Sequence, residues 1–244
     1  MKTIIAKIKG GEAEPLPLPF FCSAKQLINV LKEYAPVDKT EIKEQLQKAE
    51  TLSLEFAKDQ TASLFLLLQN GFFVNACVGC SIKDFFLEQL KLSPDFIEAR
   101  IQGVFLDGKP ADDIDRAIIR DGARLTLSGT MPGLVGIALK RGPLAVFRHS
   151  ITHRETGDYS YSGEGYVQLK LLNLLMKDMG PHLFRKGIYI NASELAHFLG
   201  KLPAAFWQGC KSISLGGRKV PTELFNEGRW RPESSVVKFS VVSG

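Results

Sequence analysis

Two cysteines stand three positions apart at Cys77-Val-Gly-Cys80, where the pattern predicts the end of a strand and the start of a helix. A helix N-terminus stabilises a thiolate and lowers the cysteine pKa, and redox pairs are built in this way. Zinc requires a second pair of ligands, and the other cysteines, Cys22 and Cys210, are single and far apart. The pair is a redox or metal candidate; alternatively, both are small residues packed at a strand end.

A second candidate for metal binding is His149 with His153, whose spacing of four suits zinc on a helix. The residues around them are β-branched enough to predict a strand instead. Four residues of a strand span about 13 Å, which is too far for two imidazoles to share one ion. We therefore expect strand or surface histidines and no metal site.

A glycine-rich apolar stretch is a candidate for contact with a ligand or partner. It contains Met131, Gly133 and Gly136. Strands usually avoid this composition, whereas glycines allow the backbone to approach a ligand or another chain closely. The alternative is a tight, buried crossover between domains.

The segment 155–165 is rich in Gly, Ser and Tyr, and it precedes a predicted helix. Glycines at a helix N-terminus can bind anions, but Glu164 would oppose a phosphate, and the third glycine of a dinucleotide fingerprint is missing. We therefore predict a mobile loop with Tyr159, Tyr161 and Tyr166 as a contact surface.

Composition describes a globular protein without an obvious reaction. The 244 residues are 45% hydrophobic and 23% charged, with a net charge of +5 that is compatible with nucleic acid or an acidic partner. The sequence contains no G-x-S-x-G elbow, no Walker loop and no zincin motif, and it implies no cofactor.

The sequence also bears on cellular location. Lys7 and Lys9 interrupt any apolar segment near the N-terminus, so we expect no secretory signal. The most apolar stretch, 64–80, contains Gln69 and Asn70 and is not a clean membrane span. We expect a cytoplasmic protein with reduced thiols and no membrane association.

The hydrophobic pattern predicts both strands and helices. Asn70-Gly71 between two apolar runs predicts a β-hairpin, and Val167 begins a helix that should stop at Gly180-Pro181. The other expected strands are 52–56, 99–106, 124–127, 144–152, 187–190 and 236–242. The other expected helices begin near Ser23, Thr40 and Ser81, and at Asn191 or Ser193.

Residues 62–136 have a familiar order: the hairpin, a helix from Ser81, a strand with Val104-Phe-Leu-Asp-Gly-Lys-Pro, and Ile119-Arg-Asp-Gly-Ala-Arg-Leu-Thr-Leu. This order resembles the β-grasp fold of ubiquitin-like sulfur carriers of the ThiS and MoaD kind. Those carriers act through a free C-terminal Gly-Gly, whereas this chain continues past the last β-grasp strand. The resemblance therefore implies a scaffold or binding surface, without the conjugation chemistry.

Residues 83–128 also resemble the S4 RNA-binding module, with a helix, a short helix near 94–100, and a strand followed by Asp107-Gly-Lys. The S4 module lacks the preceding hairpin. The resemblance implies phosphate contacts from basic side chains. These would be Lys83, Lys91, Arg100, Lys109, Arg116, Arg120 and Arg124.

We therefore predict an α+β fold in which a β-grasp-like domain, 62–136, lies between an N-terminal α/β unit, 1–61, and a C-terminal α+β unit, 137–244. The leading functional hypothesis is a non-catalytic binding or assembly protein with a protein partner or self-association. One alternative is RNA binding through the S4-like face. The other is an enzyme that uses Cys77 and Cys80 or an unrecognised pocket.

Overall fold

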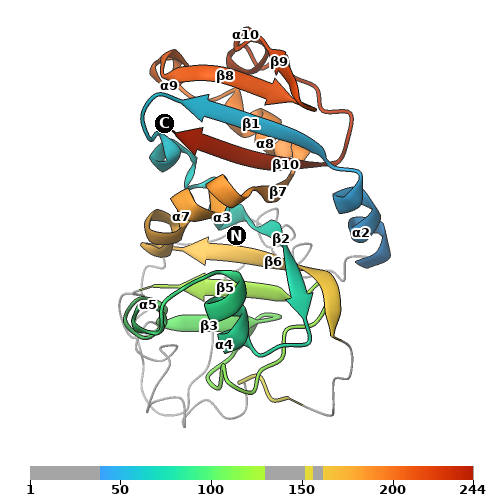
Figure 1. Cartoon of the computed structure of the whole chain (residues 1–244), viewed down its shortest axis with the longest axis vertical. Coiled ribbons are helices and arrows are strands. Elements are labelled where there is room, and N and C mark those ends of the chain that lie inside the picture. Colours follow the sequence, from blue (N-terminus) through green and yellow to red (C-terminus); the bar gives the residue numbers. More distant parts are fainter. Residues whose placement is uncertain (1–38, 130–151, 156–161, 244) are drawn as a thin grey trace, which may run out of the picture. The chain divides into compact units, whose positions relative to one another are not determined.

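Strands in which buried and exposed residues alternate build most of the described part of the chain, which comprises residues 39–129, 152–155 and 162–243 of a computed structural model. Within these residues, a ten-stranded mixed sheet can be followed in Figure 1. Its strands, in spatial order, are β4 (Lys109–Pro110), β3 (Gly103–Leu106), β5 (Arg124–Ser128), β6 (Gly163–Leu172), β2 (Phe72–Val78), β7 (Ile188–Asn191), β10 (Val236–Ser243), β1 (Glu50–Phe56), β8 (Cys210–Leu215) and β9 (Arg218–Val220).

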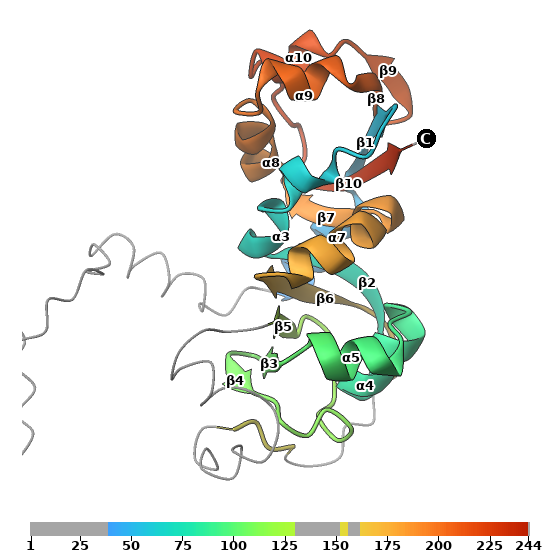
Figure 2. The same cartoon turned by 90° about the vertical axis from the view of Figure 1, so that its left-hand side faces the viewer.

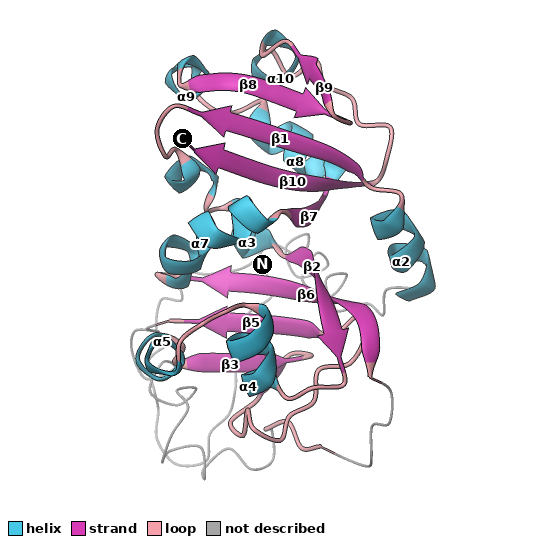
Figure 3. Ribbon diagram, in the orientation of Figure 1, coloured by secondary structure: helices cyan, strands magenta, loops and turns pink. Residues whose placement is uncertain are grey.

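Short helices connect and cover these strands, as Figure 3 shows. They are α2 (Lys39–Gln47), the 3-10 helix η1 (Thr61–Leu64), α3 (Leu67–Asn70), α4 (Ile82–Asp84), the π-helix η2 (Phe85–Gln89), α5 (Pro94–Arg100), α7 (Leu175–Lys186), α8 (Ala192–Leu199), α9 (Ala204–Gln208) and α10 (Glu223–Asn226). Helices and strands together confirm the predicted α+β class. No described helix is long and apolar enough to cross a membrane.

Segments far apart in the sequence pair within this sheet. β1 is parallel to β10, and β5 is parallel to β6, while the other neighbouring strands are antiparallel. The described residues belong to one compact unit, and each of the three regions outlined from the sequence contributes strands to its sheet.

The two faces of the sheet are covered differently. Residues of α3, η2, α5, α7, α8, α9 and α10 share one large apolar core with the inward side chains of the strands. Figure 2 shows α3 and α7 close together at the level of β7, where the two helices are in contact. On the opposite face, Leu46 of α2 packs with Tyr189 and Val236, beside the half-buried Phe73 and Tyr166.

The hairpin predicted at Asn70-Gly71 is wrong. The run before it is helical, and β2 pairs with β6. Leu64, Leu67 and Leu68 are buried whereas Leu66 is 60% exposed, which is a helical spacing in a run too short to be classified from the sequence. Gly71, at φ +100°, turns the chain from α3 into the strand.

The helix predicted from Val167 is also wrong at both ends. Residues up to Leu172 form β6, because Val167, Leu169 and Leu171 are buried in alternation. Helix α7 begins at Leu175 and continues through Gly180 and Pro181. A side chain at Gly180 would meet the Phe65 ring at 2.7 Å, so this glycine permits close packing and does not end the helix.

Other local predictions are confirmed. The strand at 52–56 lies within β1, and 236–242 lies within β10. Asp107 accepts a hydrogen bond from the Arg124 N–H at 2.9 Å, which fixes the predicted Asp-Gly turn beside β5. Asn191 caps α8 by accepting from the Glu194 N–H at 3.0 Å.

The short described segment 152–155 is anchored to residues 110–120. The His153 N–H donates to the Pro110 carbonyl at 2.7 Å. Glu155 accepts from the Ile118 N–H at 3.1 Å and pairs with Arg120. Although burial raises the pKa of Glu155, the hydrogen bonds from Ile118 and His153 and the charge of Arg120 outweigh it, so the net pKa lies below the ordinary value.

Phe239 on β10 should be a key position of the core, because it is fully buried and packs edge-to-face against Phe184 at a centroid distance of 5.9 Å. We predict that Phe239→Ala lowers the free energy of unfolding by about 3–5 kcal/mol, measured by urea denaturation. Val242→Ala on the same strand is the control. Because Val242 is 47% exposed, its effect should stay within about 0.5 kcal/mol, and equal effects would contradict this assignment.

Glu155 should make stability depend on pH in acid. A carboxylate whose pKa is lowered in the folded state stabilises the fold above its unfolded pKa, and this stabilisation is lost as pH falls through the folded value. We therefore expect the stability difference between the wild type and Glu155→Gln to be constant near neutrality and to shrink below pH 4.5, the ordinary glutamate pKa. Urea titrations at a series of pH values measure it. A difference that does not change with pH would exclude this role.

Candidate functional site

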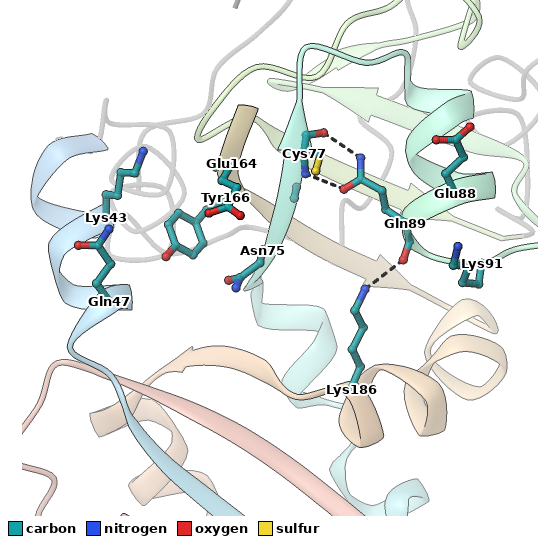
Figure 4. A pocket seen from close by; sticks show the side chains of 12 residues that line it. Lys43, Gln47, Asn75, Cys77, Glu88, Gln89, Lys91, Glu164, Tyr166 and Lys186 are labelled. Carbon is teal, nitrogen blue, oxygen red and sulfur yellow. Dashed lines mark hydrogen bonds between the residues drawn. The ribbon is translucent and has the colours of Figure 1, made fainter. Parts of the chain in front are cut away.

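A pocket of about 610 Å³ opens beside β2 and β6, which is within the range of small-ligand sites. Its lining residues come from α2, β2, η2 and the loop after η2, β6 and the end of α7: Lys43, Gln47, Asn75, Ala76, Cys77, Glu88, Gln89, Lys91, Glu164, Gly165, Tyr166 and Lys186. In Figure 4, Lys43 and Gln47 lie on one side of β2 and Glu88, Gln89 and Lys91 on the other.

The floor of the pocket follows from strand alternation. In β2, Asn75 and Cys77 are exposed between buried neighbours. They lie opposite Tyr166 and Glu164 of β6 in the antiparallel register. The side chains of each pair therefore share one face of the sheet.

The edge of β2 that faces away from β6 is open at Asn75. The N–H of Tyr166 donates to Asp121, and its carbonyl accepts from the Gly122 N–H, so both groups point away from β2. Asn75, opposite Tyr166, is therefore in a non-hydrogen-bonded pair of the β2–β6 ladder. The N–H and carbonyl of Asn75 therefore point away from β6, to the edge of β2 on the side of β7.

On that edge, β7 pairs with β2 only at Phe73 and Tyr189. Continuing this register by two residues places Gly187 opposite Asn75. Gly187 is the C-cap of α7, and its N–H is bonded to the carbonyls of Leu183 and Phe184. Among the described residues, the Asn75 backbone groups have no hydrogen-bond partner on this edge.

A side-chain amide occupies the next position of the same edge. Gln89 accepts from the Cys77 N–H at 2.7 Å and donates to the Cys77 carbonyl at 2.8 Å. The amide thus makes both bonds that a residue of a neighbouring strand would make. Gln89 belongs to η2, in which the Leu90 N–H bonds to the Phe85 carbonyl. Such π-helical turns are rare in proteins as a whole, but those that occur are often found at functional sites.

Lys186 brings a positive charge to this edge. Three lysines and two glutamates line the pocket. The Lys186 ammonium donates to the backbone carbonyl of Gln89, an uncharged group, at 3.0 Å. Lys43 lies 3.9 Å from Asp121, and Lys91 has a left-handed backbone at φ +57°. An anionic group of a ligand would therefore be attracted here.

Of the residues expected from the sequence, Cys77 and Tyr166 line this pocket. Tyr166 packs edge-to-face on Tyr189 at 6.1 Å, and burial raises the Tyr166 pKa above its ordinary value. The other expected contact residues lie outside the described residues: Met131, Gly133, Gly136, Tyr159 and Tyr161. The residues Gly163 to Gly165 belong to β6, so a loop before a helix is wrong for them.

The predicted thiolate stabilisation is wrong for Cys80. Burial raises the pKa of Cys80 above its ordinary value, and the Asp84 carboxylate raises it further. The helix N-terminus is capped by Ser81, whose hydroxyl accepts from the Asp84 N–H at 3.0 Å. Cys77 and Cys80 are both free thiols, and Cys80 donates to the Cys77 carbonyl at 3.3 Å.

Several of the residues expected to carry other chemistry are held in structural contacts. Among the described residues, no group of three His, Cys, Asp or Glu side chains could hold a metal ion. Of the seven basic residues in the S4 resemblance, four are paired with carboxylates. The pairs are Lys83–Asp115, Arg100–Asp178, Arg116–Asp113 and Arg120–Glu155.

Sequence reasoning missed Gln89, Lys186 and the open edge at Asn75. Gln89 and Lys186 are single polar residues in helices, and only the fold brings them to β2. Comparison with known protein families, with curated proteins and with solved structures found no match.

The Gln89 clamp, meaning the two hydrogen bonds between the Gln89 side-chain amide and the Cys77 backbone, should be visible in hydrogen exchange. Removing the amide with Gln89→Leu leaves the Cys77 N–H open to water, so we expect its exchange to approach that of an exposed edge residue. Amide exchange measured by NMR tests this. Glu88→Gln, one residue away in the same π-helical turn, should leave the Cys77 rate unchanged. An unchanged rate in Gln89→Leu would show that the clamp does not persist in solution.

Proposed function

We propose that this chain is a binding protein whose ligand is a small, polar molecule with an anionic group, held in the pocket between α2 and η2. The observation that carries the proposal is the open edge of β2 beside Lys186. There, Asn75, whose backbone groups have no partner on this edge among the described residues, lines the same cavity as a lysine bonded to an uncharged backbone carbonyl.

The arrangement of Lys186 supports binding of an anion. Its ammonium is fixed by the Gln89 carbonyl, so little side-chain entropy is lost when a ligand arrives. A carbonyl satisfies only one of the three ammonium donors, and the other two remain for a ligand.

The apolar contacts of α2 support a pocket that exists before the ligand binds. Leu46 is buried against Tyr189 and Val236, and this contact fixes the helix that carries Lys43 and Gln47. A site with preformed walls binds with a smaller ordering cost than one that must assemble around its ligand.

Two observations favour binding over the alternatives. Burial raises the pKa of Cys80, which does not favour a thiolate nucleophile at this position. The ion pairs of Lys83, Arg100 and Arg120 would have to be broken before these side chains reached the phosphates of an RNA.

Titration of the ¹⁵N-labelled protein with succinate, a small dianion, tests the proposal. We expect shifts of the Asn75, Gln89 and Lys186 amide signals. We expect Lys186→Gln to weaken succinate binding about tenfold, because a hydrogen bond to a charged group contributes about 1.5 kcal/mol or more. Lys177→Gln, an exposed lysine on the same helix but outside the pocket, is the control. Equal losses in both variants, or shifts only elsewhere, would refute an anion site here.

A further inference from the structure

The outer edge of β2 offers three backbone positions in succession, at Phe73, Asn75 and Cys77. Phe73 is paired with Tyr189, and Cys77 is paired with the Gln89 amide. Asn75 between them is open to the pocket. The gap is therefore one residue long, and occupied positions limit it on both sides.

A gap of this length selects for one residue and not for a strand. In a hydrogen-bonded antiparallel pair, one residue donates its N–H and accepts at its carbonyl from a single partner residue. A partner for Asn75 therefore needs one acceptor and one donor, at the spacing that an amino acid provides between its carboxyl oxygen and its own N–H. The Gln89 amide at Cys77 shows that this edge accepts such a donor–acceptor pair from a group that is not a strand.

Charge decides what kind of acceptor is preferred. Lys186 is held against Gln89, next to the gap, and Lys91 and Glu88 line the same side of the pocket, which leaves an excess of one positive charge there. A carboxylate that accepts from the Asn75 N–H is then also attracted to an ammonium, which makes the hydrogen bond stronger. A free ammonium as the donor would add positive charge beside these lysines, whereas an amide N–H adds none.

The remaining volume fits an acyl extension. A single amino acid leaves much of the 610 Å³ cavity empty. Tyr166 and the amide of Gln47 also line the pocket, and Tyr166 lies on the sheet face that it shares with Asn75, so an acyl chain that turns from the edge onto this face would meet them. The half-buried Tyr166 ring offers apolar surface there, and the amide offers hydrogen bonds.

We propose that the pocket binds an N-acylated α-amino acid, as a free molecule or as the C-terminal residue of a peptide, whose carboxylate and amide N–H pair with the N–H and carbonyl of Asn75. This inference rests on the proposed function, because it specifies the ligand class of the same pocket. It adds that recognition uses the backbone of β2, so the ligand must supply a donor as well as an anion.

N-acetylglycine and N-acetylsarcosine test it, because they differ only in a methyl group that replaces the amide hydrogen. Titration of the ¹⁵N-labelled protein should show N-acetylglycine binding at least tenfold more tightly than N-acetylsarcosine. Saturating N-acetylglycine should also slow hydrogen exchange of the Asn75 amide, whereas exchange at Cys77, already bonded to Gln89, should change little.

Affinities within twofold of each other, or an Asn75 amide that exchanges as fast with N-acetylglycine as without it, would overturn the inference. Succinate separates this failure from that of the proposed function. If succinate shifts the pocket signals while N-acetylglycine fails either criterion, the anion site stands and only the pairing at Asn75 is wrong. If neither compound shifts them, both proposals fail.

Peptides decide between the two sources of the ligand. Acetyl-Gly-Gly with a free carboxylate should bind at least as tightly as N-acetylglycine if the pocket receives a peptide C-terminus. If only the single acylated amino acid binds, the ligand is a free molecule. If the C-terminally amidated peptide binds equally well, the carboxylate is not recognised and the inference is wrong.

Discussion

The end of α7 at Gly187 is the constraint on which the candidate site depends. Gly187 has φ +85°, a conformation open mainly to glycine, and its N–H closes the last turn of the helix. The chain can therefore become a strand only from Ile188 onward. β7 reaches β2 at Phe73 and ends its pairing there, because the residue that would face Asn75 still belongs to the helix cap.

The protein compensates for this break with side chains. Two residues further along the same edge of β2, the π-helical turn of η2 brings the Gln89 amide to Cys77, and Lys186 from the end of α7 bonds to the Gln89 backbone carbonyl. Helices η2 and α7, which border the gap, are thus connected to each other through Gln89. The extra residue of a π-helical turn rotates Gln89 relative to an ordinary α-helix, and this gives a reason for the unusual turn at this place.

The sequence predicted the elements in which a single face is buried. Alternation identified β1 and β10, and turn residues identified the end of β3 and the start of α8. It failed for the run 64–68, a short apolar stretch that fits a strand and a helix equally well. It also failed for Val167 onward, where an alternating strand pattern runs directly into the leucines that lead to α7. Cys77 was predicted as a candidate because it belongs to a Cys-x-x-Cys pair, and Tyr166 because it belongs to a tyrosine-rich segment.

The rest of the site could not be read from the sequence, because its chemistry is in the backbone. Asn75 is recognisable only after the register with β6 shows which way its N–H points, and that register joins residues about ninety positions apart. Lys186 and Gln89 belong to no sequence motif, and their role in the site follows from a hydrogen bond between residues with a similar separation in the sequence. Pairings of this kind are decided by the whole core.

An open edge in the middle of a sheet is normally a liability, since unpaired N–H and carbonyl groups invite pairing with other chains. Here the gap is one residue long, because Tyr189 and Gln89 occupy the positions on both sides. A strand of another chain needs several consecutive positions, and these are not accessible. The same two contacts therefore limit the space at this edge to a single residue-sized group, so protection of the edge and the ligand class that we propose follow from one geometry.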